Sequence, residues 1–563
     1  MSNPSTHSFT PSSTSTCTRL QRWSITWIAL FSLQALLPQA VHVAPRHCRG
    51  AVKHLHLSVG KDPSTQMTIS FASAWSDPGI EAPIGGVHIG TAPNNLNRFV
   101  GEHESPVKYV SGLMGKPGHH YYSPFQHHIT IDRLKPNTTY YYIAVVGDRK
   151  LGVEHLRDMP LKDHPSQHLN LDAQNKVMAA QEEISRDNED GSIRHALRRL
   201  APPPYDGHEK PCIEGYQVRS FTTAPLPGSE DAQSATFAII GDLGQFDHSK
   251  ETLMHMTNNR AGIDAVVLVG DIAYTEYDHR RWDTFFDFLD DFSIFDEVPL
   301  QVAIGNHDID KQENGNELFQ AYESRFRMPQ VYPPEIGVYD GPPGFLNMDA
   351  PPYPLPYEWG NAYYVFDYGP AKHIVLSAYS NMNPGSKQYI WLLSELQRVD
   401  RSITPWVLVT IHVPIYNTFA LHPHDLQIFA AKEHLEPLFV QYHVNVVFTG
   451  HIHAYLRTTN VALDEPSETG PLHITIGAGG RNCDAPFKSE EPEPWVVRRD
   501  ATIYGYGRFQ IFNATHAEWR WIHLSQSDNY DYNRVKGNDV HLPQLDHDEH
   551  VLENQYFLAQ GRL

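Results

Sequence analysis

The sequence predicts two folded domains, an all-β domain followed by an α/β domain. Up to about residue 225, short runs of β-branched and aromatic residues alternate with turn signals, which is the pattern of a β-sandwich. From residue 235, short apolar strands alternate with helical stretches, which indicates an α/β fold. With 563 residues, of which 40% are hydrophobic, the chain is long enough to bury both cores.

The first domain is expected to cover residues 45–225. Its clearest strand-like runs are 55–74, 121–131, 140–146 and 216–223. The last run ends in Ala224-Pro225, where proline stops a strand. A polar insertion at 149–214 interrupts the domain, and its middle has mixed charges and a helical composition. We expect this insertion to be a solvated excursion on the surface rather than a partner site.

The second domain is expected to cover residues 235–525. Helical stretches at 282–292, 387–399 and 426–441 separate its strands. A polar tail, 526–563, follows and contains an acidic and histidine-rich cluster at 546–550. We expect a solvated terminal segment there rather than a metal site.

The N-terminal residues 1–44 predict a signal peptide behind a disordered start. Arg19 and Arg22 precede an apolar stretch at 23–37, and small residues follow it. The alternative is an uncleaved membrane anchor, but no apolar run reaches the roughly 18 residues that a bilayer span needs. The sequence therefore predicts no membrane span.

A cleaved signal peptide predicts a secreted, extracellular protein, with the vacuole and the cell wall as alternatives. The triplets that begin at Asn137 and Asn513 are glycosylation acceptors in secreted proteins. Cys48 and Cys212 flank the first domain and are a candidate pair, which leaves Cys483 free.

Composition excludes several classes of protein. The 44 basic and 65 acidic residues give a net charge of −21, whereas a protein that binds a nucleic-acid backbone needs a basic surface. Only 4 cysteines are present, which excludes a disulfide-built scaffold and a cysteine-rich zinc module. Histidine, with 34 residues, is the abundant donor.

Five predicted strands of the second domain end in side chains that bind metals. The strands are 235–240, 265–269, 300–304, 406–411 and 444–448. In open α/β sheets, ligands bind beyond the carboxyl ends of the strands, so we expect these side chains at one site. A single Gly-Asp after a strand is usually only a turn, but five such ends in one domain favour a metal site.

Seven donor side chains follow these strands. They are Asp242, Asp271, Tyr274, Asn306, His412, His451 and His453. Seven donors are too many for one four-coordinate zinc, and they suit two cations that share a bridging carboxylate. The amide and the imidazoles suit a divalent ion, whereas a phenolate suits a ferric ion.

These motifs resemble the metallophosphoesterase superfamily. Tyr274, three residues after Asp271, narrows the resemblance to the purple acid phosphatases of the large plant and fungal type. Similar stretches also lie at 388–393, 404–412, 450–455 and 471–477. The resemblance implies a catalytic domain in which two mixed sheets are sandwiched with flanking helices, preceded by a fibronectin type III-like sandwich.

The resemblance implies a role for each donor. Asp242, Tyr274 and His453 would hold the ferric ion, and Asp271 would bridge it to a divalent Zn, Mn or Fe(II) ion. The other ligands of the divalent ion would be Asn306, His412 and His451.

Three further histidines are implied as substrate-binding residues. His307 matches a histidine that contacts phosphate, and His422 matches one that is implied as a phosphate binder or general acid. Large members of the family usually have two adjacent histidines at this point, but this chain has Leu421-His422-Pro423-His424. His424 is therefore the candidate for the missing partner.

The resemblance implies an acid phosphatase, a hydrolase of phosphate monoesters. A hydroxide activated by the ferric–divalent centre would attack the phosphorus of small phosphorylated substrates. Alternatives are a phosphodiesterase or phytase with the same core, and an inactive secreted binding protein, which the complete donor set disfavours. Family members are often dimers, so a homodimer is also implied.

Overall fold

The computed structural model describes residues 52–75, 81–113, 118–158, 217–310, 318–331, 353–526 and 548–561. All of them belong to the second of the chain's two structural units, Arg49–Leu563. The predicted signal peptide, the candidate pair Cys48 and Cys212, and most of the 149–214 insertion lie outside the described residues. Within them, no helix has the length and hydropathy needed to cross a lipid bilayer.

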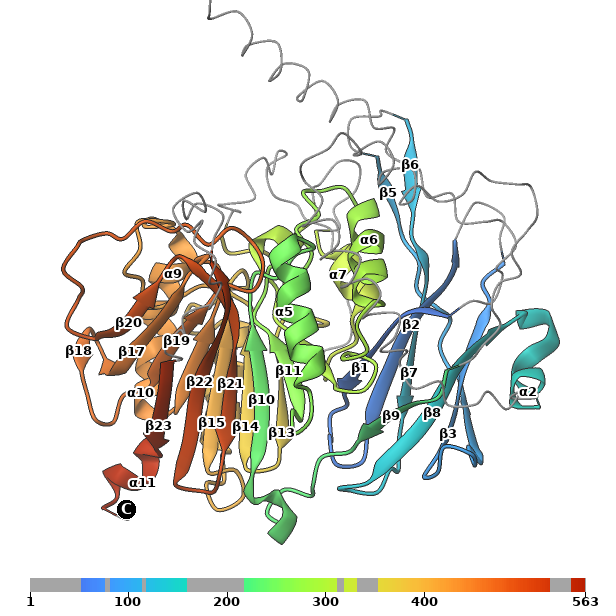
Figure 1. Ribbon diagram of the computed structural model, residues 1–563, viewed down its shortest axis with the longest axis horizontal. Helices are drawn as coiled ribbons and strands as arrows, with labels where there is room; N and C mark the ends of the chain where they lie inside the picture. The colour runs from blue at the N-terminus through green and yellow to red at the C-terminus, as the bar shows by residue number, and fades with distance from the viewer. Residues whose placement is uncertain are drawn as a thin grey trace, which may run out of the picture. The chain divides into compact units, whose positions relative to one another are not determined.

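The N-terminal strands form the predicted β-sandwich (Figure 1). One sheet has the order β1-β2-β7, and the other has the order β4-β3-β8-β9. Their bounds are β1 (Lys53–Val59), β2 (Met67–Trp75), β3 (Ile84–Gly90), β4 (Arg98–Gly101), β7 (Pro124–Ile131), β8 (Thr139–Gly147) and β9 (Arg219–Thr222). Phe71, Val87 and Tyr142 are buried in the core between the sheets because alternate residues of a strand point to the same face.

Two smaller elements complete this domain. A hairpin of β5 (Val110–Gly112) and β6 (His120–Tyr122) pairs beside the sheets. The described start of the insertion forms a 3₁₀ turn (Arg149–Leu151) and α2 (Gly152–Arg157), and Leu156 of α2 is fully buried. The carbonyl of Leu156 accepts a hydrogen bond of 2.9 Å from His88 Nε2 on β3. The first turns of the insertion are therefore packed on the sandwich rather than solvated.

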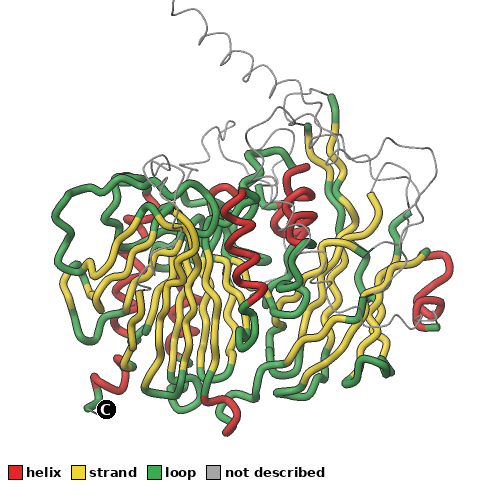
Figure 2. Tube along the Cα trace, viewed as in Figure 1, coloured by secondary structure: helices red, strands yellow, loops and turns green. Residues whose placement is uncertain are grey.

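Two mixed sheets form the α/β domain, as predicted (Figures 1 and 2). The first has the order β12-β11-β10-β21-β22-β23, and the second has the order β13-β14-β15-β16-β19-β17-β18 with β20 paired to β17. The strands of the first sheet are β10 (Ala235–Ile240), β11 (Ala265–Leu268), β12 (Leu300–Val302), β21 (Ile503–Ile511), β22 (His516–Gln526) and β23 (Asp548–Glu553). Those of the second are β13 (Tyr364–Tyr368), β14 (Ala371–Leu376), β15 (Trp406–Ile411), β16 (Val446–Thr449), β17 (Tyr455–Ala462), β18 (Glu465–Pro466), β19 (Leu472–Ile476) and β20 (Val496–Asp500).

Aromatic contacts join the two sheets face to face. Phe237 of β10 packs edge-on against His373 of β14, with ring centroids 5.8 Å apart. Phe448 of β16 meets Phe509 of β21 at 5.7 Å. These side chains are fully buried, so the core of the domain lies between the sheets and fixes the register of one against the other.

Helices flank this sandwich of sheets. They are α5 (Asp247–Asn258), α6 (Arg280–Leu289), α7 (Gln320–Arg325), α8 (Lys387–Gln397), α9 (Leu426–Ala430), α10 (Glu436–Gln441) and α11 (Gln555–Ala559). Of these, α6, α8 and the pair α9 and α10 lie at the predicted stretches, whereas α5, α7 and α11 were not predicted. A π-helical turn, Ala431–Leu435, joins α9 to α10 within the predicted stretch 426–441. In α8, Ser386 caps the N-terminus by accepting from the backbone N–H of Tyr389 at 3.2 Å, and Trp391 and Leu392 face the core.

The expectation of a solvated tail is wrong for residues 548–561. β23 pairs with β22 and becomes the edge of the first sheet. Asp548 accepts hydrogen bonds from Arg457 Nε at 2.7 Å and from the Tyr455 hydroxyl at 2.6 Å, and Leu552 is buried. Asp548 is therefore paired with side chains of β17 in the second sheet, and Glu549 with Arg520 of β22 in the first, which the composition of the tail alone does not reveal.

A buried ion pair connects the two domains. Arg325 of α7 donates to Asp283 of α6 at 2.9 Å, and both are held by the hydroxyl of Tyr121, which comes from β6 of the all-β domain. Arg325 is 1% exposed and lies near the rings of Tyr109 and Trp282. Because a buried charge needs its partner, this cluster fixes the β5–β6 hairpin of the all-β domain to the α/β domain.

We predict that Asp283→Ala lowers the free energy of unfolding by about 3–5 kcal/mol, because it leaves the Arg325 guanidinium buried without its counter-ion. Chemical denaturation measures this change. The matched control is Lys53→Ala, which removes an exposed ion pair to Asp287 of 3.2 Å and should cost at most about 1 kcal/mol. Equal losses in the two variants would contradict the role of the buried pair.

Candidate metal centre

The seven predicted donors lie just beyond strand ends of the two facing sheets. Asp242, Asp271 and Asn306 follow β10, β11 and β12 of the first sheet, and His412 and His451 follow β15 and β16 of the second. Parallel pairing within each sheet, β10 with β11 and β15 with β16, brings neighbouring ends to the same edge. The structure therefore gathers donors that are up to 211 positions apart, from Asp242 to His453.

Several of these residues have a left-handed backbone. The φ angles are 54° at Asp242, 53° at Asp271, 50° at Tyr274 and 69° at His451. For residues other than glycine this conformation is uncommon and costs about 1–3 kcal/mol each. The packed strands on either side compensate this strain. The left-handed conformation turns each side chain toward the common site.

Glycines next to the donors leave room for them. A methyl group at Gly305 would overlap Oδ1 of Asp271, and one at Gly450 would overlap Oδ2 of Asp242. Gly270, with φ of 100°, lies against the imidazole of His412. The glycines that precede the donors in the sequence thus have a steric reason: any side chain would occupy the space of a donor.

The first group of donors surrounds Asp242. The Tyr274 hydroxyl lies 3.1 Å from Asp242 Oδ1 and 2.9 Å from His453 Nε2. His453 Nε2 is 3.5 Å from Asp242 Oδ1. Asp242, Asp271 and His453 together offer one donor atom each, all within 4.8 Å of one another.

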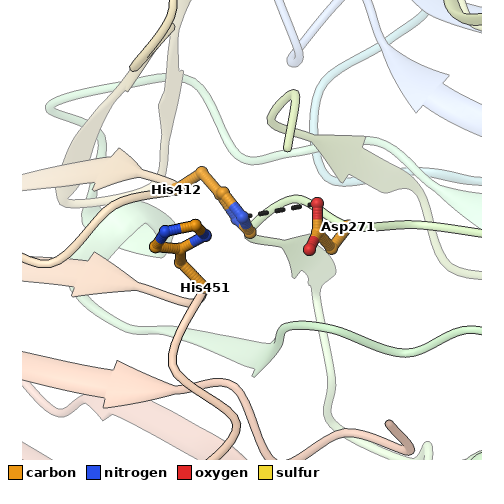
Figure 3. Close-up of side chains that lie close together, drawn as sticks. All are labelled: Asp271, His412 and His451. Carbon is orange, nitrogen blue, oxygen red and sulfur yellow. Dashed lines mark ion pairs between the residues drawn. The ribbon is translucent and has the colours of Figure 1, made fainter. Parts of the chain in front are cut away.

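The second group surrounds Asn306 and is drawn in part in Figure 3. Asn306 Oδ1 is 3.2 Å from His412 Nε2 and 3.0 Å from His451 Nδ1. His412 Nε2 is also 3.4 Å from Asp271 Oδ1, the pair joined by the dashed line in Figure 3. Asp271, His412 and His451 again offer donor atoms within 4.8 Å of one another.

Asp271 belongs to both groups, and this fits a pair of cations that share one carboxylate. Burial would raise the pKa of Asp271, but the neighbouring imidazoles of His412 and His307 outweigh it, and the pKa lies well below its usual range. Burial would lower the pKa of His412, but Asp271 outweighs it and raises this pKa to about 9. Burial with Asp242 close by raises the pKa of Tyr274, so a phenolate there requires cationic charge, which a bound metal supplies.

The predicted substrate-binding histidines differ in their placement. His307 packs at a tilt against Tyr274 with ring centroids 4.5 Å apart, and its Nε2 is 4.0 Å from Asp271 Oδ2. The ring of His422 lies 4.0 Å from that of His451. His424 is exposed, and in the described part of the chain no hydrogen bond or ion pair joins it to a predicted donor.

Asp425 is a residue that the sequence analysis did not name. Its Oδ2 is 2.9 Å from His451 Nε2 and 3.2 Å from His422 Nδ1, so one carboxylate oxygen orients both rings. Burial would raise its pKa, but hydrogen bonds from the two histidines outweigh it and lower the pKa to about 2. Its position before α9, three residues after His422, is the sequence signal that could have suggested it.

Glu276 is a second residue of this kind. Its Oε1 lies 3.5 Å from His307 Nδ1, and this contact lowers the pKa of Glu276. The carboxylate therefore orients His307 from the side away from Asp271. No sequence motif marks this residue. Glu276 itself has φ of 52° and lies in a loop with other left-handed residues, so only the folded loop shows where its side chain points.

Comparisons with known proteins agree with this architecture. Three family models match successive parts of the chain: a purple acid phosphatase N-terminal domain at 52–153, a calcineurin-like phosphoesterase at 235–455, and an iron/zinc purple acid phosphatase-like protein C at 470–532. Each of the three models describes a part of a phosphoesterase or purple acid phosphatase, so the chain is similar to the purple acid phosphatases along most of its length. The predicted resemblance is thus confirmed, and the β-sandwich coincides with the N-terminal model.

Individual relatives extend the comparison. The chain is 35% identical over 294 residues to purple acid phosphatase 18 of Arabidopsis thaliana, covering 52% of this chain and 60% of the relative. It is 32% identical over 322 residues to Fe(3+)-Zn(2+) purple acid phosphatase 12 of the same plant, covering 54% and 62%. The chain thus spans about three fifths of the length of these relatives.

A solved structure shares the fold. A purple acid phosphatase isolated from yellow lupin (Lupinus luteus) seeds aligns with a TM-score of 0.59 and 17% identity, over 85% of this chain and 74% of that chain. The predicted fold class, an all-β sandwich before an α/β domain of two mixed sheets, is therefore confirmed.

We predict that Gly305→Ala lowers the bound metal content, because the new methyl group would displace the Asp271 carboxylate. Elemental analysis of the purified variant measures the loss. Gly385→Ala is the control, because no atom lies within 4 Å of its added carbon. Its φ of 94° strains an alanine, whereas Gly305 has φ of −107°, so the control has a backbone cost that Gly305→Ala lacks. An unchanged metal content in Gly305→Ala would mean that Asp271 does not ligate the cations.

We predict that Asp425→Asn weakens the binding of one cation about 10–100-fold, because His451 loses the carboxylate that orients its ring. Calorimetric titration of the metal-free protein with Zn²⁺ measures the affinity. Asp400→Asn changes a carboxylate that bonds only to Ser402 on the surface, among the contacts given for the described residues, and should leave the affinity unchanged. Equal affinities in all three proteins would refute the positioning role.

Proposed function

We propose that this chain is an acid phosphatase, which hydrolyses phosphate monoesters at a centre of one ferric and one divalent cation. The observation that carries the proposal is the place of Asp271 in two separate donor groups. The similarity to the purple acid phosphatases supports it. The alternatives, a phosphodiesterase or phytase and an inactive binding protein, have no observation in their favour.

The two donor groups divide the ligands between the cations. Asp242, Tyr274 and His453 would hold the ferric ion, because phenolate and carboxylate are hard donors. Asn306, His412 and His451 would hold the divalent ion, and Asp271 would serve both. The name of the Arabidopsis relative, an Fe(3+)-Zn(2+) enzyme, favours zinc over Mn or Fe(II) at the divalent position.

A pair of bound cations would polarise the phosphoryl group and make a water molecule acidic enough to supply the nucleophile below neutral pH. The protein contributes the positioning. His307 Nε2 faces Asp271, because Glu276 holds the other nitrogen, and it would donate to a phosphoryl oxygen. This hydrogen bond would stabilise charge that grows on the phosphoryl oxygens in the transition state.

His422 would act as the general acid. Asp425 accepts from its Nδ1, which leaves Nε2 as the atom that can donate to the departing oxygen. The same Asp425 orients His451, so the proton donor and one cation ligand share a single support. For His424, we propose at most a contact with the exposed part of a substrate, in keeping with its exposure.

We also propose a secreted location, which rests on the signal peptide predicted in 1–44. Both glycosylation candidates, Asn137 and Asn513, lie in exposed turns where a glycan can be attached. The vacuole and the cell wall remain alternatives. The proposed substrates are small phosphorylated molecules. We keep the domain limits 45–225 and 235–525. Homodimerisation stays a prediction from the family.

We predict that the purified protein contains one iron and one divalent ion per chain and hydrolyses 4-nitrophenyl phosphate faster than its bis-ester at mildly acidic pH. Elemental analysis and the two substrates test this together. Asp271→Ala should lose both ions and all turnover, because both donor groups lose their shared member. Iron retained by Asp271→Ala, or a preference for the bis-ester, would overturn the proposal.

We predict that His422→Ala slows hydrolysis of alkyl phosphates about 10²–10⁴-fold, because a poor leaving group needs a proton from the general acid. Hydrolysis of 4-nitrophenyl phosphate should slow much less, since its leaving group departs as an anion. The dependence of kcat on leaving-group pKa measures the difference. An equal loss on all esters would assign His422 to phosphate binding.

A further inference from the structure

A pocket of about 290 Å³ opens beside the metal centre in the described part of the chain. It lies between the segment that follows β15, the helix α9, and the residues before β20. Among its lining residues are Ile415, Tyr416, Phe429 and Trp495, with the charged Lys432 and Lys488 at its sides. Its volume approaches the lower end of the range found for small-molecule sites.

The pocket shares one wall with the proposed active site. His422 lines it, and the ring of His422 also lies 4.0 Å from that of His451. A group that leaves from phosphorus with a proton from His422 therefore has this pocket beside it. Because the proposed general acid, His422, belongs to both the pocket and the proposed active site, the pocket is more than an unrelated hollow on the surface.

Aromatic rings give the pocket its chemical character. Trp495 packs edge-on against Tyr416 with ring centroids 5.1 Å apart, and both are nearly fully buried. Phe429, by contrast, is 51% exposed although it is large and apolar. An exposed phenylalanine at the rim of an aromatic pocket is a surface that a flat apolar ligand can cover.

The charged residues of the pocket already have partners. Lys432 pairs with Asp464 and lies 4.4 Å from the centre of the Tyr416 ring. Lys488 Nζ donates to the carbonyl of Asn417 at 2.7 Å, and Glu493 accepts from Thr418 at 2.6 Å. Two lysines and two carboxylates line the pocket, so their formal charges cancel and no charged ligand is required.

We propose that this pocket binds the leaving alcohol of the substrate, and that the preferred substrates are phosphate monoesters of alcohols with a flat, apolar ring system larger than one benzene ring. The proposal rests on the proposed phosphatase function, since it uses His422 as the proton donor. Trp495 and Phe429 are then specificity-determining residues. These two side chains would contact the leaving group, and the metal centre would bind the phosphoryl group.

Phenyl phosphate and 2-naphthyl phosphate test this, because their leaving groups have similar acidity but differ by one fused ring. The wild-type protein should have a kcat/KM about tenfold higher for the naphthyl ester, since the second ring is buried in the pocket. Phe429→Ala should lower kcat/KM for the naphthyl ester much more than for phenyl phosphate, and so remove most of this preference. Trp495→Ala should do the same, and Phe429→Ala remains informative if the buried Trp495 variant fails to fold.

A binding measurement and a matched control complete the experiment. 2-Naphthylphosphonate should bind the metal-loaded protein more tightly than phenylphosphonate in calorimetry, and Phe429→Ala should abolish the difference. Leu426→Ala is the control, because Leu426 is 61% exposed on the same helix but is not part of the pocket lining.

The outcomes separate the two proposals. Hydrolysis of both esters with no naphthyl preference, or an equal change for both esters in Phe429→Ala, would overturn the pocket assignment and leave the phosphatase function standing. Loss of the preference in Leu426→Ala as well would also overturn it. Hydrolysis of neither ester by the wild-type protein would overturn the phosphatase function and the pocket assignment with it.

Discussion

The site depends on one buried carboxylate that serves two sets of donors. Asp271 is 1% exposed, stands at the end of β11 and reaches His412 on one side and the group around Asp242 on the other. Burying a carboxylate is costly unless cationic partners surround it. Without metals the imidazoles provide that charge, and with them the cations do. The facing sheets, the left-handed strand ends and the neighbouring glycines all serve to keep this carboxylate in place.

Much of this arrangement could be predicted because its signals are local. Each donor follows a short apolar strand within one to six residues, and parallel strands of one sheet end at one edge, so the donors of each sheet gather there. The packing of the two sheets against each other then brings the two sets of donors together. Asp425 was missed because its role comes from two partners, and one of them, His451, is 26 residues away. The strand β23 was missed because its charged residues are typical of a solvated tail. Only the structure shows that Arg457 donates to Asp548 there. The strand β3 went unnamed because Gly85 and Gly86 interrupt its apolar pattern.

The sandwich and the catalytic domain are linked more closely than their separate cores suggest. Besides the Arg325 cluster, Tyr142 of β8 donates to the carbonyl of Asp296 at 2.7 Å, and His128 Nε2 lies 3.0 Å from the carbonyl of Ser324. These contacts reach the segments that lead into β12 and α7. The all-β domain therefore supports the loops near Asn306 and His307, although it supplies none of the predicted donors.

The position of β21 has a consequence for how the protein is made. The strand that carries Asp242, β10, pairs with β11 on one side but with β21, Ile503–Ile511, on the other. During translation, one side of β10 thus stays unpaired until β21, residues 503–511, has left the ribosome. Unpaired strand edges recruit other strands and promote aggregation. We therefore expect the nascent sheet to need shielding by chaperones until β21 pairs with β10.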